Sequence, residues 1–416
     1  MRGRPLLWTI ITGIPISLVT TIAWFGVFTF VNGYLVRDLH YSNSDWTACT
    51  LWFVGAMIGW QLVCTEISAK IGRRATITAA MALTALGYLG LAITVDLTWI
   101  RICLVLLGFI TAATAAAWLP HVVEIGGSRP GRAIAAIQLI GSVIGMGALI
   151  GGGYTIAGLN YRQAFLLFAG VCALCTIAFH LFSPAMGKGS GSRVVSLLNV
   201  SRRDALRLAR GPALVILLLG VCIEPFNFHT VNQLFPNLAR DVHGFTEKDI
   251  SLTVALARIS SVPSLLILAR IIDRISALRC YGVVFLLSGA CVVWAGAATG
   301  TGSLIAAVAV FYLFHGGVWG TDVASLNAAV ETHLLDSAFA IMGIASLGSV
   351  FVVGFVHNRM LNANLPLPQI FMWCGLAAVI CGLALFVYSF SSHSVIDPTD
   401  SLAVGDKPER DECRVG

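Results

Sequence analysis

Glu224, Arg258 and Asp322 stand well inside long apolar stretches of the sequence. On insertion scales, a charge near the centre of a bilayer costs at least about 2.5 to 3.5 kcal/mol, so such residues usually mark functional sites. A carboxylate at that depth can take up and release a proton, which makes Glu224 the first candidate for proton coupling and Asp322 the second. The alternative for both acids is structural, either an ion pair with Arg258 or a hydrogen bond between helices.

Polar side chains accompany these charges at helical spacing. Pro225 directly follows Glu224 and removes a backbone donor, and irregular backbone inside a membrane is tolerated where it lines a cavity. His315, Trp319 and Asp322 recur at i, i+4 and i+7, which places them on one helical face. Each of three histidines in these segments is expected to pack or to form a hydrogen bond rather than to carry a proton. They are His229, His315 and His357. The candidate substrate-binding residues from this part of the chain are Asn227, Asn232, Arg258, His315 and Trp319.

The composition requires a lipid environment around these residues. Hydrophobic residues make up 57% of the chain and charged residues 11%, and the mean hydropathy is +0.86, far from the averages of soluble domains. Stretches of about 20 apolar residues can cross a bilayer as helices. They are placed near residues 7–33, 47–68, 75–95, 100–123, 133–156, 163–183, 212–236, 250–271, 280–298, 303–328, 338–358 and 367–391. The expected fold class is an all-α membrane protein with twelve transmembrane helices, because continuous apolar segments of this length argue against a β-barrel.

The positive charges predict the orientation. With the amino terminus in the cytoplasm, 19 of the 26 Lys and Arg residues fall on the cytoplasmic side, as the positive-inside rule requires. We therefore expect a multi-pass protein of the cell membrane, with both termini cytoplasmic and a bacterial plasma or inner membrane as the location. The first apolar segment has no convincing cleavage site and is expected to be a retained span.

The cysteines and the linker complete the organisation. The cysteines lie almost entirely inside apolar segments, so we expect neither a disulfide framework nor a metal site, and no cofactor. Residues 184–211 carry six basic residues and one acid, which predicts a basic cytoplasmic linker that either lies on lipid or is a solvated tether. The expected division is therefore a bundle at 1–183, the linker at 184–211, a second bundle at 212–391 and a disordered cytoplasmic tail at 392–416.

Several residues recur in the same order in the two halves, which indicates duplication of one unit. Arg37, Asp38 and His40 recur 203 residues later as Arg240, Asp241 and His243, and Glu124 recurs as Glu331 at a separation of 207. In the 203-residue register, Thr21 and Trp24 occupy the places of Glu224 and Asn227. The acidic chemistry is therefore expected in the second half alone.

A short basic loop follows the second predicted helix, at residues 69–74. Its sequence Ala-Lys-Ile-Gly-Arg-Arg resembles the loop G-x-x-x-D-R-x-G-R-R of the major facilitator superfamily, with Thr65 and Ala69 in place of the glycine and the aspartate. The second half keeps Asp273 and Arg274 of that pattern, whereas Ser276 and Leu278 depart from it. Residues 160–165 also resemble the W-R-x-x-F entry of the sixth helix, and residues 129–132 the basic loop after the fourth.

The resemblance implies two six-helix bundles around a central cavity, with the first, fourth, seventh and tenth helices lining it. The first helix would then offer Thr21, Trp24, Phe28 and Asn32 to the substrate. It also implies that the basic loops act as a cytoplasmic gate, pairing with acids and with the carboxyl ends of neighbouring helices. The expected gate residues are Glu66, Lys70, Arg73, Arg74, Glu124, Asp273, Arg274 and Glu331, with Glu66 as a hypothetical substitute for the missing loop aspartate. The alternative is that these charges only set the topology.

These features favour a secondary active transporter that moves a small solute by alternating access, coupled to protons. Arg258 gives a slight preference for a small organic anion as the substrate. The resemblance implies this role, because an arginine in the eighth helix receives the substrate carboxylate in some organic-anion members of the superfamily. Proton-driven efflux of cationic or amphiphilic compounds and a non-transporting scaffold or sensor remain alternatives. A channel is disfavoured because no filter is visible, and a membrane enzyme because no nucleophile, base or metal set is clustered. The expected partners are the solute, protons and the lipid bilayer, with a monomeric protein and no nucleic acid.

Overall fold

The computed structural model describes residues 4–118, 121, 130–158, 160–183, 186, 212–261, 263, 267, 271, 277–316 and 335–391. These residues form α-helices and short π-helical segments, and no strand occurs among them. The predicted linker and tail lie outside the described residues apart from Met186, so the domain division stays a prediction.

The N-terminal half begins with a helix that runs almost unbroken from residue 4 to residue 38. It consists of α1 (Arg4–Phe25) and the π-helical segments η1 (Gly26–Val31) and η2 (Tyr34–Asp38). The other helices of this half are α2 (Asn43–Ile71), α3 (Arg73–Ile93), α4 (Leu97–Ala113) with η3 (Thr114–Trp118), α6 (Pro130–Gly158) and α7 (Tyr161–Phe182).

The C-terminal half repeats this arrangement. Its first helix combines α10 (Pro212–His229), η4 (Thr230–Leu234), α11 (Phe235–Asn237) and η5 (Leu238–Val242). The helices that follow are α12 (Glu247–Ile259), α14 (Ala277–Ala297), α15 (Thr301–His315), α17 (Leu335–Asn362) and α18 (Leu367–Ser391). The described helices thus group into six consecutive segments in each half, as the duplicated fold requires.

Five described helices are long and apolar enough to cross a membrane. They are Thr12–Asp38, Arg73–Ile93, Tyr161–Phe182, Leu278–Ala297 and Leu367–Phe390, and three shorter apolar helices accompany them. Large apolar side chains on the outside of the bundle are widely exposed, including Ile93 at 75%, Leu174 at 68% and Ile380 at 61%. A water-soluble monomer rarely exposes so many such residues, whereas lipid tails accept them.

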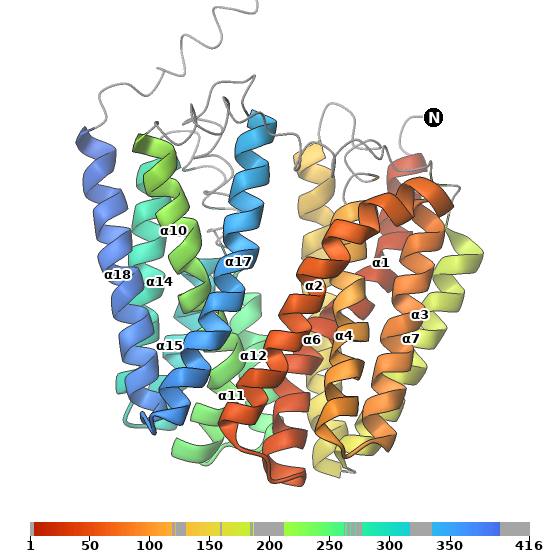
Figure 1. The fold of residues 1–416 in the computed structure, drawn as a ribbon, viewed down its shortest axis with the longest axis horizontal. Helices are drawn as coiled ribbons and strands as arrows, with labels where there is room; N and C mark the ends of the chain where they lie inside the picture. Colours follow the sequence, from red (N-terminus) through yellow and green to blue (C-terminus); the bar gives the residue numbers. More distant parts are fainter. Residues whose placement is uncertain are drawn as a thin grey trace, which may run out of the picture.

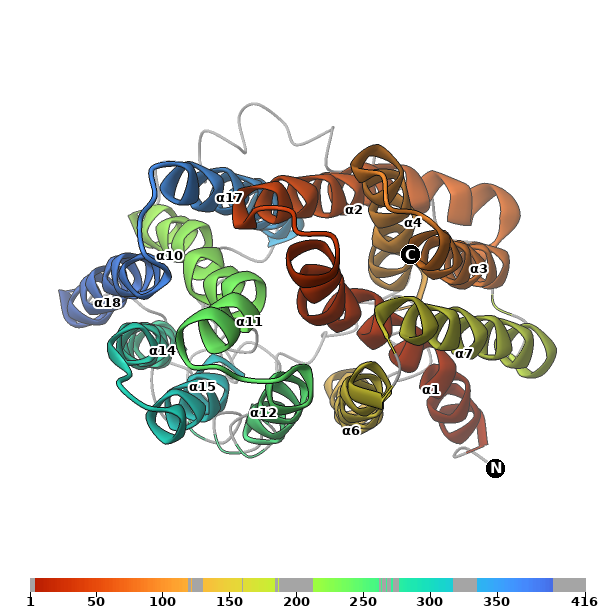
Figure 2. The same cartoon turned by 90° about the horizontal axis from the view of Figure 1, so that it is seen from below.

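The two halves lie side by side (Figure 1). Both views place α2 beside α17 and α6 beside α12, so these four helices form two seams between the halves (Figures 1 and 2). The end that contains α11 and the turns at residues 39–42 and 243–246 lies opposite the amino terminus (Figure 1). We call this the distal end.

The structural repeat has a register of 204 residues along the first helix of each half. η1 and η4 begin at Gly26 and Thr230, and η2 and η5 begin at Tyr34 and Leu238. After both helices the backbone turns left-handed, at His40 with φ 56° and at Gly244 with φ 69°. The recurring Arg-Asp-x-His residues indicated a separation of 203 residues, which differs by one residue from the separation of the structurally equivalent positions in these helices. The ends of the helical segments define which positions are equivalent, whereas a short charged motif does not.

The corrected register changes which residues are equivalent. Glu224 takes the place of Thr20 rather than Thr21, and Phe228 takes the place of Trp24. The hydroxyl oxygens of Thr20 and Thr114 are 3.2 Å apart, and Thr114 is the first residue of η3. The N-terminal half thus has a neutral hydroxyl pair where the C-terminal half has an acid.

Asp45 and Asp249, which lie 204 residues apart, have the same structural role. Each is the third residue of a helix and completes a capping box, with Ser42 at the start of α2 and with Thr246 at the start of α12. Such boxes satisfy two free N–H groups at a helix start. These repeated acids therefore fix the distal beginnings of the two helices.

Candidate coupling and substrate site

Glu224 lies in α10, the helix that Pro225 and η4 make irregular. One carboxylate oxygen of Glu224 lies 3.1 Å from Nε2 of His315 in α15, and the two side chains are 14% and 4% exposed. The His315 ring is stacked between Phe228 and Phe311 at centroid distances of 4.8 and 5.0 Å, with both interplanar angles at 13°. The aromatic rings therefore hold the imidazole against the carboxylate, in a place where a shared proton would be shielded from bulk water.

Arg258 in α12 reaches the opposite half of the protein. Its guanidinium carbon lies 3.4 Å from the centre of the Phe25 ring and 5.4 Å from the centre of the Tyr312 ring. The Tyr312 hydroxyl donates a hydrogen bond of 3.0 Å to Oδ1 of Asn232, whose amide donates to the Phe228 carbonyl. Among the described residues no carboxylate forms an ion pair with Arg258, so aromatic faces and a phenol surround a cation that can still accept an anion.

An aromatic cluster joins the two halves at the same level. Trp24 faces Phe228 at 6.4 Å with an interplanar angle of 26°, and it also contacts Phe28, Phe53 and His229 at 5.2, 5.9 and 6.0 Å. Phe28 and Phe53 are buried, whereas Trp24 is partly exposed. Trp24 and Phe28, two of the residues that the resemblance assigned to the substrate, thus lie beside α10, the helix that contains Glu224.

A hydrogen-bonded histidine network continues toward the distal end. The Gln233 side chain lies between His229 and His357, with its amide nitrogen 3.4 Å from Nδ1 of His229 and its oxygen 3.2 Å from Nδ1 of His357. Nε2 of His357 lies 3.0 Å from the Thr230 hydroxyl. These buried histidines are hydrogen-bonded, as the sequence led us to expect of single histidines.

Arg240 and Glu247 form a buried ion pair at the distal end. Nη2 and Nε of Arg240 lie 2.5 and 2.9 Å from Oε1 of Glu247, with the two side chains 7% and 5% exposed. Arg240 also donates to Asn237 and, across the halves, to Asn32 at 3.4 Å. Arg37 reaches the same Glu247 oxygen at 3.6 Å but is 51% exposed.

Further contacts close the distal end between the halves. The Gln233 carbonyl accepts hydrogen bonds of 3.2 Å from both Asn32 and Trp46. At the α2–α17 seam, the Asn358 amide donates to the Ser44 carbonyl at 2.7 Å and to the Thr47 hydroxyl at 3.1 Å. The structure thus holds the halves together at the distal end through polar contacts.

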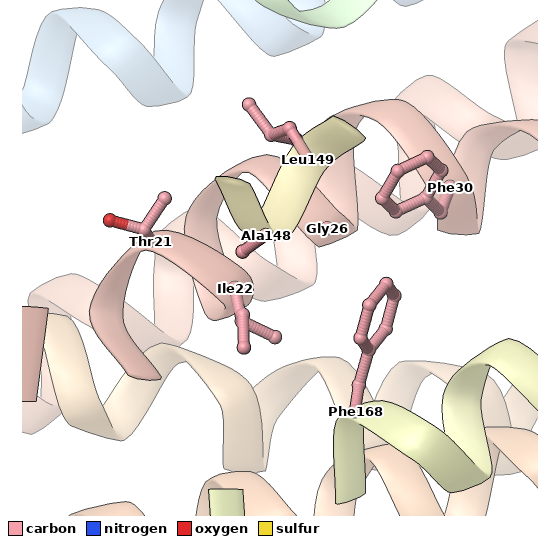
Figure 3. Close-up of a pocket in the computed structure, with 7 residues that line it drawn as sticks. All are labelled: Thr21, Ile22, Gly26, Phe30, Ala148, Leu149 and Phe168. Carbon is pink, nitrogen blue, oxygen red and sulfur yellow. The ribbon is translucent and has the colours of Figure 1, made fainter. Parts of the chain in front are cut away.

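Thr21 lies away from this centre. It lines a small crevice between α1, α6 and α7, together with Ile22, Gly26, Phe30, Ala148, Leu149 and Phe168 (Figure 3). Its volume of about 10 Å³ is at the lower limit for one water molecule, and Thr21 supplies its one hydroxyl. The crevice is therefore a packing gap within one half, and a substrate role for Thr21 stays a prediction without support from its neighbours.

The remaining predicted site residues are dispersed. Asn227 donates to the Ser288 hydroxyl on α14 at 3.2 Å, and Asn32 belongs to the distal contacts. Of the gate residues, Glu66 and Lys70 are exposed, Arg73 is buried, and Arg74 donates to the His180 carbonyl. Outside the described residues lie Trp319, Asp322, Glu124, Asp273, Arg274 and Glu331.

Sequence reasoning missed the distal ion pair and most of the aromatic partners. The sequence marks Arg240 only as part of the recurring Arg-Asp-x-His residues, and it does not single out Glu247. Their spacing of seven residues across a helix-to-helix turn has no helical periodicity to mark it. Phe53, Phe228 and Phe311 are ordinary apolar residues in apolar helices, so only the packing identifies them.

Two similar helical bundles, joined along two seams, are the architecture of many secondary transporters. The family model of the Major Facilitator Superfamily matches residues 14–344. The chain belongs to this superfamily, and it is a multi-pass membrane transporter rather than an enzyme. Comparison with curated proteins gives no match.

Solved transporter structures share the fold. The nucleoside transporter NupG aligns with a TM-score of 0.75 at 12% identity, over 91% of this chain and 99% of its own. The xylose transporter XylE from E. coli, in a partially occluded inward open conformation, aligns with a TM-score of 0.68 at 13% identity, over 92% and 99% of the chains. The peptide transporter POT, in complex with alafosfalin, aligns with a TM-score of 0.71 at 12% identity, over 92% of this chain and 94% of its own. At such identities the likeness concerns the fold.

Proposed function

We propose that this transporter moves a small organic anion together with protons by alternating access. The observation that carries the proposal is the Glu224–His315 pair, with 3.1 Å between a carboxylate oxygen and Nε2 of the imidazole and a location inside the helix bundle. A carboxylate and an imidazole in contact can exchange one proton between them, and either group can release it when the surroundings change. In this proposal, proton binding at the pair depends on the conformation of the transporter.

The anion preference is supported by Arg258. This cation lies between Phe25 of one half and Tyr312 of the other, so a bound anion would touch both halves at once. A guanidinium recognises a carboxylate through two parallel hydrogen bonds. A substrate bound there would bias the relative position of the halves, as alternating access requires.

The distal contacts supply the gate in this proposal. With both termini in the cytoplasm, as the charge distribution predicts, the distal end faces the extracytoplasmic side. The ion pair of Arg240 with Glu247 and the amide contacts of Asn358 would then keep that side closed. We propose that one chain suffices, because the two halves that must move relative to each other belong to the same chain.

The test compares wild-type protein with Glu224→Gln in proteoliposomes. A labelled carboxylate, chosen from a binding panel, is added outside, and its entry is measured. Glutamine keeps the size of the side chain and cannot ionise. We expect the variant to retain substrate exchange across the membrane and to lose accumulation driven by a pH gradient.

Asp241→Asn provides the matched control, because Asp241 is an exposed acid at the distal end of the same helix. It should accumulate substrate like the wild type. Undiminished pH-driven accumulation by Glu224→Gln would refute the coupling role.

A further inference from the structure

Trp24 and Phe228 occupy equivalent positions in the two halves of the protein. They are 204 residues apart, which is the register of the structural repeat, and their rings face each other across the halves at 6.4 Å and 26°. Trp24 is partly exposed, and Phe228 is 9% exposed. Two nearly parallel rings therefore meet at the centre of the pseudo-symmetric molecule, one from each half.

Both rings are supported from behind. Phe28 and Phe53 meet Trp24 at angles of 68° and 57°, and His315 stacks under Phe228 at 4.8 Å. The centroid distance of 6.4 Å is at the long end of direct aromatic contact. A planar ring between them would need a spacing of about 7 Å, since each stacking contact takes about 3.5 Å. The two rings contact each other in this structure, so α1 and α10 would have to separate for such a ring to enter.

A positive group contacts the residue that follows Trp24 in the chain. Arg258 lies over Phe25, the residue that follows Trp24, and the Tyr312 phenol beside it is linked through Asn232 to the Phe228 carbonyl. The region where α1 and α10 meet therefore holds two aromatic faces, and α12 and α15 bring a planar cation and a hydroxyl to residues of the same two helices. This combination matches a flat apolar ring with an attached anion.

We propose that the substrate is a planar aromatic or heteroaromatic carboxylate, with its ring between Trp24 and Phe228 and its carboxylate at Arg258. This inference rests on the proposed transport of an organic anion and narrows it to one chemical class. A saturated ring of the same size is thicker than an aromatic ring and lacks its π faces. The ring pair should therefore discriminate between the two.

The experiment measures binding to the purified full-length protein by calorimetry, with two matched pairs of acids. These are benzoate against cyclohexanecarboxylate, and 2-naphthoate against its fully saturated counterpart. Because an aromatic ring can stack on both faces of the site, the aromatic member of at least one pair should bind about tenfold more tightly or better.

Variants locate the discrimination. Phe228→Leu should reduce the preference for the aromatic acid to about twofold or less, whereas Phe228→Tyr, which keeps the ring, should retain it. Arg258→Gln should weaken both members of each pair alike. A thermal unfolding curve for each variant establishes whether it is folded. If Phe228→Leu does not fold, the inference is tested by the wild-type preference together with Phe228→Tyr and Arg258→Gln.

The outcomes separate the inference from the function on which it rests. Equal affinity for aromatic and saturated acids, with Arg258→Gln weakening both, would overturn the aromatic inference and leave anion transport in place. Absence of binding by all four acids would overturn the inference together with the anion part of the proposed function. A preference that survives in Phe228→Leu would overturn the assignment of the ring site.

Discussion

At the scale of single residues, the distal ion pair separates two arginines that look alike in the sequence. Arg240 is 7% exposed and directs two nitrogens at one oxygen of Glu247, whereas Arg37 is 51% exposed and stands 3.6 Å from the same oxygen. Removing one partner of a buried pair costs about 3 to 5 kcal/mol, while exposed pairs contribute about 0 to 1 kcal/mol. The two arginines should therefore differ sharply in their effect on the gate.

The prediction compares Arg240→Gln with Arg37→Gln. Arg240→Gln leaves Glu247 buried without its main partner and should open the distal end, which hydrogen–deuterium exchange would detect as faster exchange of the amides in residues 32–46 and 232–246. Arg37→Gln should change this exchange little. Equal effects of the two substitutions would contradict the assignment of Arg240 as the closing residue.

The residue scale also explains why only part of the site could be predicted. Glu224 is conspicuous in the sequence because it is a carboxylate in an apolar segment, whereas only the structure identifies its contact with His315, and its coupling role stays a prediction. Thr21 and Trp24 are three residues apart on one helix, yet one faces α6 and the other faces the opposite half. A helix that is apolar on all sides gives no periodicity from which to choose the cavity face.

At the scale of elements, glycine determines how closely the two halves approach along the α6–α12 seam. A Cβ atom on Gly153 would lie 2.5 Å from Cβ of Ser251 on α12, closer than real side chains come. At Gly151, two residues earlier on α6, a Cβ would meet nothing within 4 Å. The glycine-rich stretch therefore serves helix packing between the halves at one of these positions and not at the other.

The same substitution at both positions tests this seam. Gly153→Leu should hold α6 and α12 apart, speed amide exchange at the distal end and lower the rate of transport at least about tenfold, because the distal-closed state would cost more than 1.4 kcal/mol extra. Gly151→Leu should keep wild-type exchange and transport. If Gly153→Leu closes and transports normally, the seam does not depend on close approach.

At the scale of the whole molecule, duplication supplies the scaffold and the differences between the copies supply the chemistry. The π-helical segments and capping boxes recur at 204 residues, so both halves present irregular helices to the centre. The acid of that centre stands in the C-terminal half, at the place where the N-terminal half has Thr20. In the proposed function, such an asymmetry would let a proton and an anion act on one half while the other half provides the opposing wall.

The fold could be predicted further than the site because it follows from features that repeat along the chain. Apolar segment length, the distribution of basic residues and the recurring loops predicted a duplicated helical transporter, and the superfamily match confirms that class. Arg240 with Glu247 and Gln233 with His357 depend on contacts between helices far apart in sequence or on opposite sides of a turn. No local pattern marks such partners before the helices are packed.

The measurement that tests the central claim most directly is proton movement caused by substrate. A pH-sensitive dye inside proteoliposomes reports internal pH after the tightest-binding acid of the panel is added outside, with protein-free vesicles correcting for passive entry of the acid. Wild-type protein should acidify the interior faster than protein-free vesicles, and Glu224→Gln should not exceed them. Identical acidification by wild-type protein and Glu224→Gln would contradict proton coupling through the Glu224–His315 pair.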